Sequence, residues 1–289
     1  MSNEVKDGTN PHFKIRLVNI VYIAIAIVVV IGVVVYVLST ASGGTVSVGN
    51  GWTYIKGESV LSSDGKVDFY SMGLQYCEYC AVENYAIFEA LSNFGDWTYY
   101  GKPINLSSID PLNASSQPHD NAILYQAEEG DWTLYLLNPH LSYYSQYVNF
   151  TLTELSYNNG SNFMSPTMGE APYVSKYNPD IASPFSVVGG NFFEIGAVDS
   201  LVSSGVPILF NESDVTGYRY GAPIFGGYPP AYIFSQLKQP SSVIANGINT
   251  EAAYISAVLC YDLALSGKPT MPPVCSSSDV QGLGISSKV

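Results

Sequence analysis

The longest apolar run in the chain lies close to its first residue. Residues 17–38, LVNIVYIAIAIVVVIGVVVYVL, carry no charge, and Asn19 is their only strongly polar side chain. At about 1.5 Å of rise per residue, such a helix is long enough to cross a hydrocarbon core of roughly 30 Å. A buried core helix normally keeps a polar face, which this segment lacks. The pattern therefore predicts a transmembrane helix over residues 17–38, in contact with the lipid bilayer.

Positive charge before this helix predicts its orientation. Lys6, Lys14 and Arg16 lie in residues 1–16, and the last two lie at the membrane edge. Basic residues beside a first span favour a cytoplasmic tail, so we expect the C-terminal domain to be extracellular. The alternative is a cleaved signal peptide, whose apolar region is usually about 7–15 residues long. The longer run favours an uncleaved single-pass anchor in the cell membrane, although residues 39–42 (STAS) resemble a weak cleavage site.

Beyond the anchor, some segments show the two-residue hydrophobic period of strands and others the roughly 3.6-residue period of helices. Residues 66–72 (KVDFYSM) alternate apolar and polar positions, which is typical of a strand. In residues 81–94, apolar side chains recur at helical spacing, and Gly95 follows as a stop signal. Further strands are expected over residues 98–105, 133–137 and 147–155, and helices over residues 229–237 and 241–265.

Turn signals divide the rest of the chain. Residues 183–195, SPFSVVGGNFFEI, contain two apolar segments around a Gly-Gly-Asn turn, which predicts a hairpin. The Gly-, Ser- and Thr-rich residues 39–52 are expected to be a linker, and residues 53–289 the extracytoplasmic domain. Segments rich in turn residues predict insertions at about 106–145 and 196–227.

Composition restricts what this domain can bind. The chain has 11 basic and 24 acidic residues, a formal net charge of −13, and only 12% charged residues. A negative surface repels nucleic acid, so no nucleic-acid partner is expected. Polarity supplied by hydroxyls and amides is typical of an exposed, acidic environment. Outside a cell, five sequons are candidate glycosylation sites, and they start at Asn105, Asn113, Asn149, Asn159 and Asn211.

Two cysteines carry the clearest chemistry. Cys77 and Cys80 lie where a predicted strand meets a predicted helix. Free N–H groups and the dipole at a helix start favour negative charge on the first sulfur. Cys77 is then the exposed nucleophile and Cys80 the buried resolving thiol, while the neighbouring Glu78 opposes the thiolate. We therefore expect a pair that is less oxidising than the strongest oxidants of its class.

Two other interpretations of this pair stay open. A zinc site needs two further ligands, whereas the chain beyond its N-terminal tail has only His119 and His140 and no second CxxC motif. No metal and no other cofactor is therefore expected. The second alternative is a permanently oxidised, structural pair in a scaffold without exchange activity. No nucleotide-binding, serine-hydrolase or metalloprotease motif suggests a different chemistry.

The order of these elements resembles a thioredoxin fold with insertions, and VDFYSMGLQYCEYC resembles the thioredoxin approach to its active site. With AVENYAIFEALSNFG, SPFSVVGGNFFEIGA and CYDLALSGKPTMPPVC, the chain resembles an archaeal family catalogued as domain of unknown function 929. The resemblance implies a membrane-anchored, thioredoxin-like α/β (α+β) fold over roughly residues 67–275. The family usually has proline after the first cysteine, where this chain has Glu78.

The thioredoxin resemblance also implies a second part of the site. In such folds a cis-proline opens the strand that faces the CxxC motif, and the preceding residue offers its backbone to a partner chain. Pro184 and Ser183 match these two positions. Tyr76 and Tyr79, on either side of Cys77, are the further residues expected to contact a substrate. An ordinary proline at a strand start is the alternative for Pro184.

The remaining cysteines, Cys260 and Cys275, are expected to form a structural disulfide. An even number of cysteines outside the cytoplasm favours pairing, and closing a loop of about 15 residues stabilises by roughly 3 kcal/mol. A second shuttle pair is the alternative. The sequence thus predicts a membrane-anchored thiol–disulfide oxidoreductase that acts on extracytoplasmic protein thiols. Its alternative is a redox-inert scaffold or a subunit of an envelope complex.

Overall fold

The structure is a computed structural model, and it describes residues 44–58, 60, 62–116, 121–127, 131–196 and 228–289. The chain divides into two compact units, of which the second, Thr45–Val289, is described below. The predicted cytoplasmic tail (1–16), transmembrane helix (17–38) and most of the predicted insertion at 196–227 lie outside the described residues.

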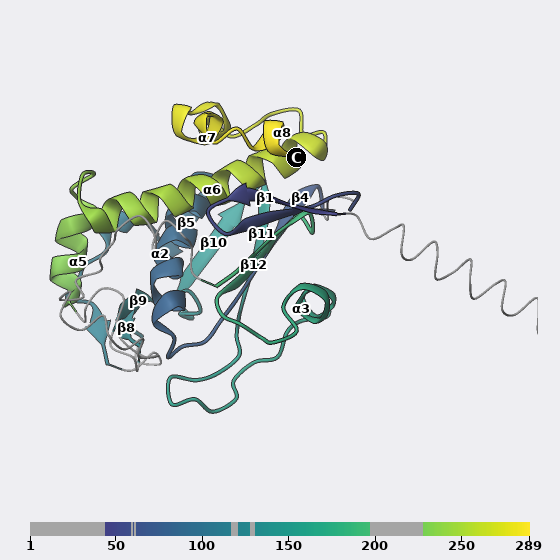
Figure 1. The fold of residues 1–289 in the computed structure, drawn as a ribbon. Coiled ribbons are helices and arrows are strands. Elements are labelled where there is room, and N and C mark those ends of the chain that lie inside the picture. The colour runs from purple at the N-terminus through teal and green to yellow at the C-terminus, as the bar shows by residue number, and fades with distance from the viewer. Residues whose placement is uncertain (1–43, 59, 61, 117–120, 128–130, 197–227) are drawn as a thin grey trace, which may run out of the picture. The chain divides into compact units, whose positions relative to one another are not determined.

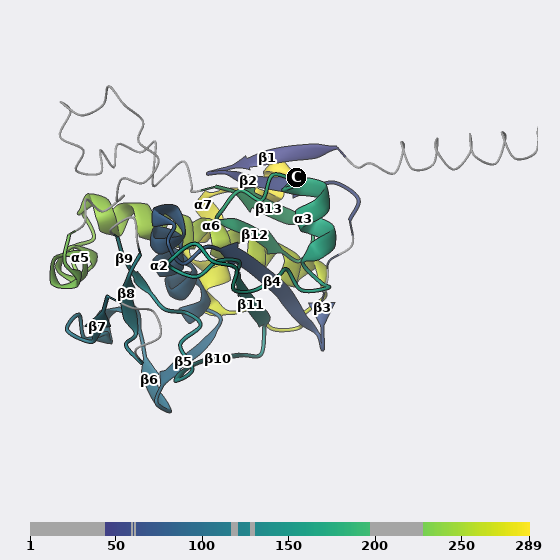
Figure 2. The ribbon, with the colours of Figure 1, turned by 90° about the horizontal axis from the view of Figure 1, so that it is seen from below.

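A seven-stranded sheet forms the centre of the second unit. Its strands are β1 (Thr45–Gly49), β2 (Trp52–Ile55), β3 (Ser62–Ser63), β4 (Lys66–Gly73), β11 (Val148–Glu154), β12 (Phe185–Val188) and β13 (Phe192–Ile195). Their order is β1-β2-β13-β12-β4-β11, with β3 paired to β4 (Figure 2). β11 is parallel to β4, whereas β12 is antiparallel to both β4 and β13. The fold is therefore mixed α+β, with one parallel pair at the edge of an otherwise antiparallel sheet.

Helices lie on both faces of this sheet (Figure 1). α2 (Glu78–Ser92) packs against the long helix α6 (Val243–Leu265) on one face, and α3 (Ala171–Tyr177) lies on the other. β4 is buried on both faces, because Phe69 packs in the cluster that contains α2 and α6, and Met72 packs with Val174 of α3. Polar residues of β4 are buried as well, since Asp68 is 7% and Ser71 is 3% exposed.

The C-terminal half of the chain adds short helices around α6. They are α5 (Pro230–Leu237), the 3-10 helix η3 (Pro273–Ser276), α7 (Ser278–Gly282) and α8 (Ile285–Lys288). All four pack against α6. Among the described residues, α6 is the one helix that is long and apolar enough to cross a bilayer, and 67% of that apolar window is buried inside the protein. Its apolar composition is thus explained by its place in the core.

Two three-stranded sheets are built largely from the predicted insertion at 106–145. One joins β5 (Gly95–Tyr99), β6 (Lys102–Ile104) and β10 (Leu141–Ser145), and the other joins β7 (Ala114–Ser115), β8 (Leu124–Gln126) and β9 (Trp132–Leu134). A 3-10 helix, η1 (Leu106–Ser108), lies between β6 and β7 in the chain. The Thr133 hydroxyl of β9 donates to the Ala81 carbonyl of α2 at 2.7 Å. Because α6 and β9 both pack against α2, this helix is buried almost all round.

Most of the predicted elements are confirmed. The strands expected over 66–72 and 147–155 are β4 and β11, and the hairpin expected over 183–195 is β12 and β13. The helices expected over 229–237 and 241–265 are α5 and α6, whereas the strand expected over 133–137 is shorter and ends at Leu134. Long apolar patterns of one period are thus well predicted from the sequence.

The linker expected over residues 39–52 is wrong from Thr45 onwards. Residues of β1 pair with β2, which places β1 at the edge of the central sheet. The compact domain therefore begins at Thr45 rather than at residue 53. Small polar residues are accepted in this strand because most of β1 is not fully buried.

Two details around Gly95 are also wrong. α2 ends at Ser92, and Gly95 begins β5 instead of stopping the helix. A Cβ at Gly95 would lie 2.2 Å from the backbone oxygen of Tyr144, so the glycine permits β10 to approach. The single strand expected over 98–105 is a hairpin, because Tyr100 and Gly101 both adopt positive φ and reverse the chain.

Candidate functional site

Cys77 lies at the junction between β4 and α2. It is the N-cap of α2, with φ −78° and ψ 122°, and its Sγ accepts a hydrogen bond from the Cys80 N–H at 3.3 Å. The sulfur thus occupies the place of the side-chain oxygen that usually satisfies a free N–H group at a helix start. This placement at the strand-to-helix junction agrees with the sequence analysis.

Cys80 lies one turn into α2, beside Cys77. Its thiol donates to Cys77 Sγ over 2.9 Å, and both are free cysteines. Because a disulfide has an S–S distance of about 2.0 Å, a small movement suffices to join them. The exposed fractions are 6% for Cys77 and 3% for Cys80. The prediction of an exposed Cys77 is therefore wrong, because the segment before β12 lies against its sulfur.

Ser183 supplies that contact. Cys77 Sγ donates a weak hydrogen bond to the Ser183 carbonyl oxygen at 3.9 Å, although 106 residues separate them in the chain. The Ser183–Pro184 peptide bond is cis, and Pro184 is buried. Pairing of Phe185 with Met72 in the sheet brings this segment beside the end of β4. The structure thus brings together the two cysteines and the Ser183–Pro184 segment.

Tyr76 and Tyr79, the other residues predicted to contact a substrate, lie near the cysteines but differ in what they pack against. Tyr76 is half-buried in the loop before Cys77. Tyr79 is also half-buried, and its ring packs against the main hydrophobic core. Glu78, whose carboxylate was expected to oppose the Cys77 thiolate, is buried in the first turn of α2. Substrate contact by Tyr76 and Tyr79 stays a prediction.

A buried carboxyl group that was not predicted from the sequence lies next to the cysteine pair. Glu154 ends β11 opposite Gly73, the last residue of β4, and is only 3% exposed. A Cβ on Gly73 would lie 3.3 Å from Glu154 Oε2 and 3.4 Å from Cys80 Sγ. Because residue 73 is a glycine, no side chain at this position separates the Glu154 carboxyl group from the Cys80 thiol. The sequence did contain a sign that Glu154 is buried, because residues two apart share a face of a strand and Glu154 follows the apolar Leu152 in β11.

Burial controls the protonation of this group of side chains. It raises the pKa of Glu154 to about 8. It also raises the pKa of the Cys80 thiol well above its usual value, and the contact with Cys77 and the charge of Glu154 add to the effect. The Tyr125 hydroxyl donates to the Gln75 carbonyl oxygen at 3.1 Å, and burial raises its pKa as well. Because the pKa of Cys80 is raised, its thiol loses a proton readily only when a nearby group accepts that proton.

Among the described residues, the further ligands that a zinc site would require are not assembled around the cysteines. His140 stacks on the ring of Tyr100 with a centroid distance of 3.9 Å, and His119 lies outside the described residues. Among the described residues, the side chains close enough together to share a metal ion are Glu83, Glu194 and Glu251. None of these is a cysteine, so the described residues do not support zinc at the pair.

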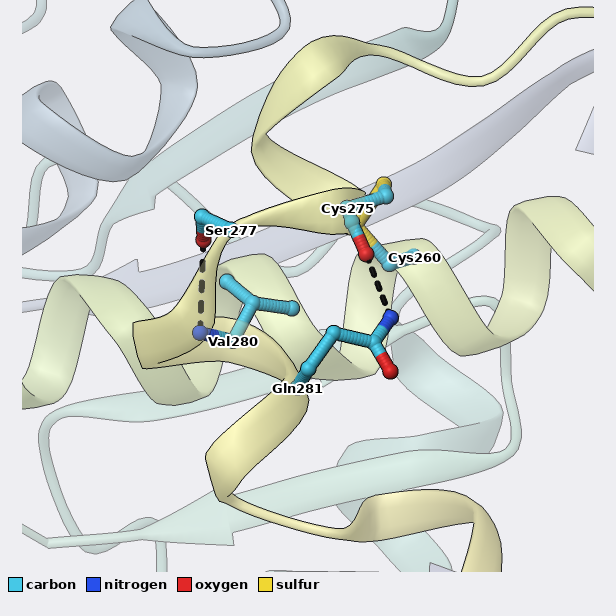
Figure 3. Close-up of a disulfide and its surroundings, with 5 residues drawn as sticks. All are labelled: Cys260, Cys275, Ser277, Val280 and Gln281. Atoms are coloured by element: carbon cyan, nitrogen blue, oxygen red, sulfur yellow. Dashed lines mark hydrogen bonds between the residues drawn. A yellow bond between two sulfur atoms is a disulfide. The ribbon is translucent and has the colours of Figure 1, made fainter.

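Cys260 and Cys275 form a disulfide, as predicted (Figure 3). It joins α6 to η3, and both residues are buried. The side-chain amide of Gln281 in α7 donates to the Cys275 carbonyl oxygen. The bridge therefore fastens the C-terminal helices to the core, which is a structural role.

Four of the five predicted glycosylation sites are described. Asn105 and Asn159 are exposed, whereas Asn113 and Asn149 are half-buried. The amide nitrogens of the half-buried pair donate hydrogen bonds to neighbouring groups, which a glycan would displace. Asn211 lies outside the described residues. Among the four, the exposed pair is better placed to accept a glycan.

The fold and the site define a mixed α+β domain in which a cysteine pair at a helix start meets a proline-led strand. The family model described as "Domain of unknown function (DUF929)" matches residues 54–261, from β2 into α6. The chain belongs to this family, so the family resemblance of the motifs is confirmed, although Cys275 lies beyond the match. No curated protein and no solved structure matches the chain.

Proposed function

We propose that this domain is a thioredoxin-like thiol–disulfide oxidoreductase. One observation carries the proposal: Cys77 caps a helix, with Cys80 Sγ at 2.9 Å and the Ser183 carbonyl oxygen at 3.9 Å. The first contact suits closure of a disulfide within the pair. The second places a backbone carbonyl where a partner chain would lie during exchange.

The arrangement of elements supports the same proposal. β4 leads into the cysteine pair and α2, β11 is its parallel neighbour, and the proline-led hairpin of β12 and β13 is its antiparallel neighbour. α6 follows and packs against α2. The resemblance to thioredoxin led us to expect a strand, the CxxC motif, a helix, further strands, a proline-led hairpin and a helix, and the elements follow one another in this order.

The exchange reaction proceeds in two steps when a client is reduced. The Cys77 thiolate attacks one sulfur of a client disulfide, the client bond breaks, and the other client sulfur leaves as a thiolate. Cys80 then attacks Cys77 Sγ in the mixed disulfide, which closes the Cys77–Cys80 bond and releases the second client sulfur. Two electrons pass to the client, and the reverse sequence oxidises a client dithiol.

Glu154 is the proposed proton acceptor for Cys80. The Cys80 thiol must lose its proton before the second step, and burial opposes the thiolate. Glu154 lies across the Gly73 position from it, and its pKa of about 8 allows it to take up and release a proton near neutral pH. The proton then passes to a departing client thiolate. Proton transfer of this kind typically contributes about 10²- to 10⁴-fold to a rate.

A redox-inert scaffold is the second candidate, and the burial of Cys77 favours it. A client sulfur must approach Cys77 Sγ directly, yet only 6% of this residue is exposed. Exchange therefore requires the Ser183 segment to move away from the sulfur. In the scaffold, the Cys77–Cys80 bond would be permanent, and the domain would dock an envelope partner through its surface.

Equilibration of the full-length chain with glutathione buffers of graded potential decides between the two. An exchange-active pair becomes reduced within the range of these buffers, whereas structural disulfides remain oxidised below about −300 mV. Cys77→Ser is the control that removes the signal. A pair that resists reduction throughout the series would defeat the oxidoreductase proposal and favour the scaffold.

We also propose that residues 17–38 anchor the domain on the outside of the cell membrane, where its clients are extracytoplasmic protein thiols. The uncharged run and the basic residues before it support this topology. Protease added to intact cells should remove the C-terminal domain. Complete protection of the domain, with cleavage only after lysis, would reverse the proposed orientation.

A further inference from the structure

Three glutamates from different elements meet inside the domain. Glu83 of α2, Glu194 of β13 and Glu251 of α6 each provide a carboxylate oxygen within 4.8 Å of the others. Their exposed fractions are 1%, 2% and 0%. Carboxylates in an interior repel one another and lose their hydration, so a buried group of this kind needs protons or a bound cation to be stable.

Glu83 is the member that points to a ligand. Glu251 Oε1 accepts a hydrogen bond from Trp52 Nε1 at 2.9 Å, and its Oε2 accepts one from the Asn50 side chain. In contrast, neither oxygen of Glu83 has a hydrogen-bond partner among the described residues. Buried polar groups are normally hydrogen-bonded, and buried charges are paired or coordinate metals. The Glu83 carboxyl lies within the group, and the described side chains offer it neither a hydrogen-bond donor nor a positive charge.

No basic side chain compensates Glu83 or Glu251 in the part of the chain that the structure describes. The ion pair found there joins Lys176 and Glu58 at the surface, at 3.4 Å. The neutralising charge for Glu83 and Glu251 must then come from outside the described side chains. Protons and a metal cation are two such sources.

The kind of donor atom indicates which cation the three glutamates would bind. All three side chains offer carboxylate oxygens, which are ligands of hard cations, and the group has no nitrogen or sulfur donor. Calcium binds oxygens at about 2.3–2.6 Å in flexible geometry and accepts bidentate carboxylates, so oxygens up to about 5 Å apart can share one ion. Magnesium is smaller and usually keeps several waters. We propose that Glu83, Glu194 and Glu251 form a binding site for a calcium-type divalent cation.

The turn between β1 and β2 closes over this site. A Cβ on Gly51 would lie 2.8 Å from Glu194 Oε1, and Gly51 has a φ of +82°, so only glycine fits without a shift. Trp52 follows directly and contacts Glu251. A bound cation thus joins α2, which carries the cysteines, to β13 and α6. Because the ligands must be deprotonated, the ion competes with protons and its affinity rises with pH.

Calcium titration of the full-length chain in detergent, after removal of metals with a chelator, tests the site. We expect one ion per chain at neutral pH, with proton release that calorimetry in buffers of different ionisation enthalpy detects. An ion present at a hundredfold excess over its Kd should raise the unfolding midpoint by about 5 °C or more. Glu83→Gln should abolish binding. Glu89→Gln, on the same helix but outside the group, is the matched control and should bind as the unaltered protein does.

Terbium luminescence provides a test that does not require a folded Glu83 variant. Terbium replaces calcium in oxygen sites, and excitation of Trp52 beside Glu251 should sensitise its emission; Trp52→Phe should remove that emission. Failure of calcium and terbium to bind the folded chain at millimolar concentration and neutral pH would overturn the proposal. Equal binding by a folded Glu83→Gln variant would overturn it as well. Neither readout involves the thiols, so the result is independent of the proposed exchange activity.

Discussion

Raising the pH should destabilise this domain through its buried carboxyl groups, and Glu154→Gln isolates one of them. Burial raises the pKa of Glu154 from an ordinary 4.5 to about 8 in the folded chain. The folded state therefore binds the proton more tightly than the unfolded state does. The stabilisation is fully present below about pH 4.5 and is lost as the pH rises through about 8.

The size of this effect follows from the shift. At about 1.36 kcal/mol per pKa unit, a rise from 4.5 to about 8 corresponds to a loss on the order of 5 kcal/mol for one carboxyl group. Asp262 provides a second, separate case, since burial raises its pKa to about 8 against the opposing hydrogen bond from Asn191. We expect Glu154→Gln and Asp262→Asn each to abolish the loss of stability that deprotonation of the replaced carboxyl group causes at high pH.

Denaturant unfolding of the full-length chain between acidic and mildly alkaline pH provides the assay. All three tryptophans, Trp52, Trp97 and Trp132, belong to the domain, so their fluorescence reports its unfolding. The free energy of unfolding should fall with pH less steeply in each variant than in the unaltered chain. Parallel pH profiles for the unaltered chain and Glu154→Gln would refute the assignment of a raised pKa to this carboxyl group.

Three further predictions concern the site and the core. Glu154→Gln should slow resolution of a mixed disulfide by about 10²-fold or more, seen as accumulation of the glutathione adduct on Cys77; an unchanged rate would exclude Glu154 as the proton acceptor. Replacing both Cys260 and Cys275 by alanine should lower stability by roughly 3 kcal/mol in denaturant unfolding. The glutathione equilibrium of the other pair should not change, and a change would favour the shuttle alternative. Gly95→Ala should destabilise by about 1–3 kcal/mol in the same assay, because its Cβ would clash with the backbone of β10; an unfolding midpoint equal to that of the unaltered chain would contradict this packing.

Local pattern was sufficient to predict much of the chain. The alternation in β4 and β11, the Gly-Gly-Asn turn of the hairpin and the helical period of α6 depend on neighbours a few residues apart, so they are legible in the sequence. The same holds for the cysteine pair, since its place at a helix start follows from the elements on either side. The family and the Cys260–Cys275 bridge were likewise predicted.

The burial of the carboxyl groups could be predicted only partly from the sequence. Glu154 and Glu194 stand in alternating apolar registers with Leu152 and Phe192, and Glu251 stands within the apolar face of α6. These signals were available in the sequence. Glu83 had no such signal, because it lies off the apolar face predicted for α2, and only tertiary packing brings it beside Glu194 of β13 and Glu251 of α6.

Only the tertiary structure decided which distant segments meet. Pairing of β12 with β4 brings Ser183 to Cys77 and covers its sulfur, and pairing of β11 with β4 places Glu154 across Gly73 from Cys80. Residues far apart in the chain acquire these contacts through strand register, which depends on the whole sheet. The sequence therefore determined the chemistry of the individual side chains and their local elements. The fold decided their exposure and protonation, because both depend on what packs around them.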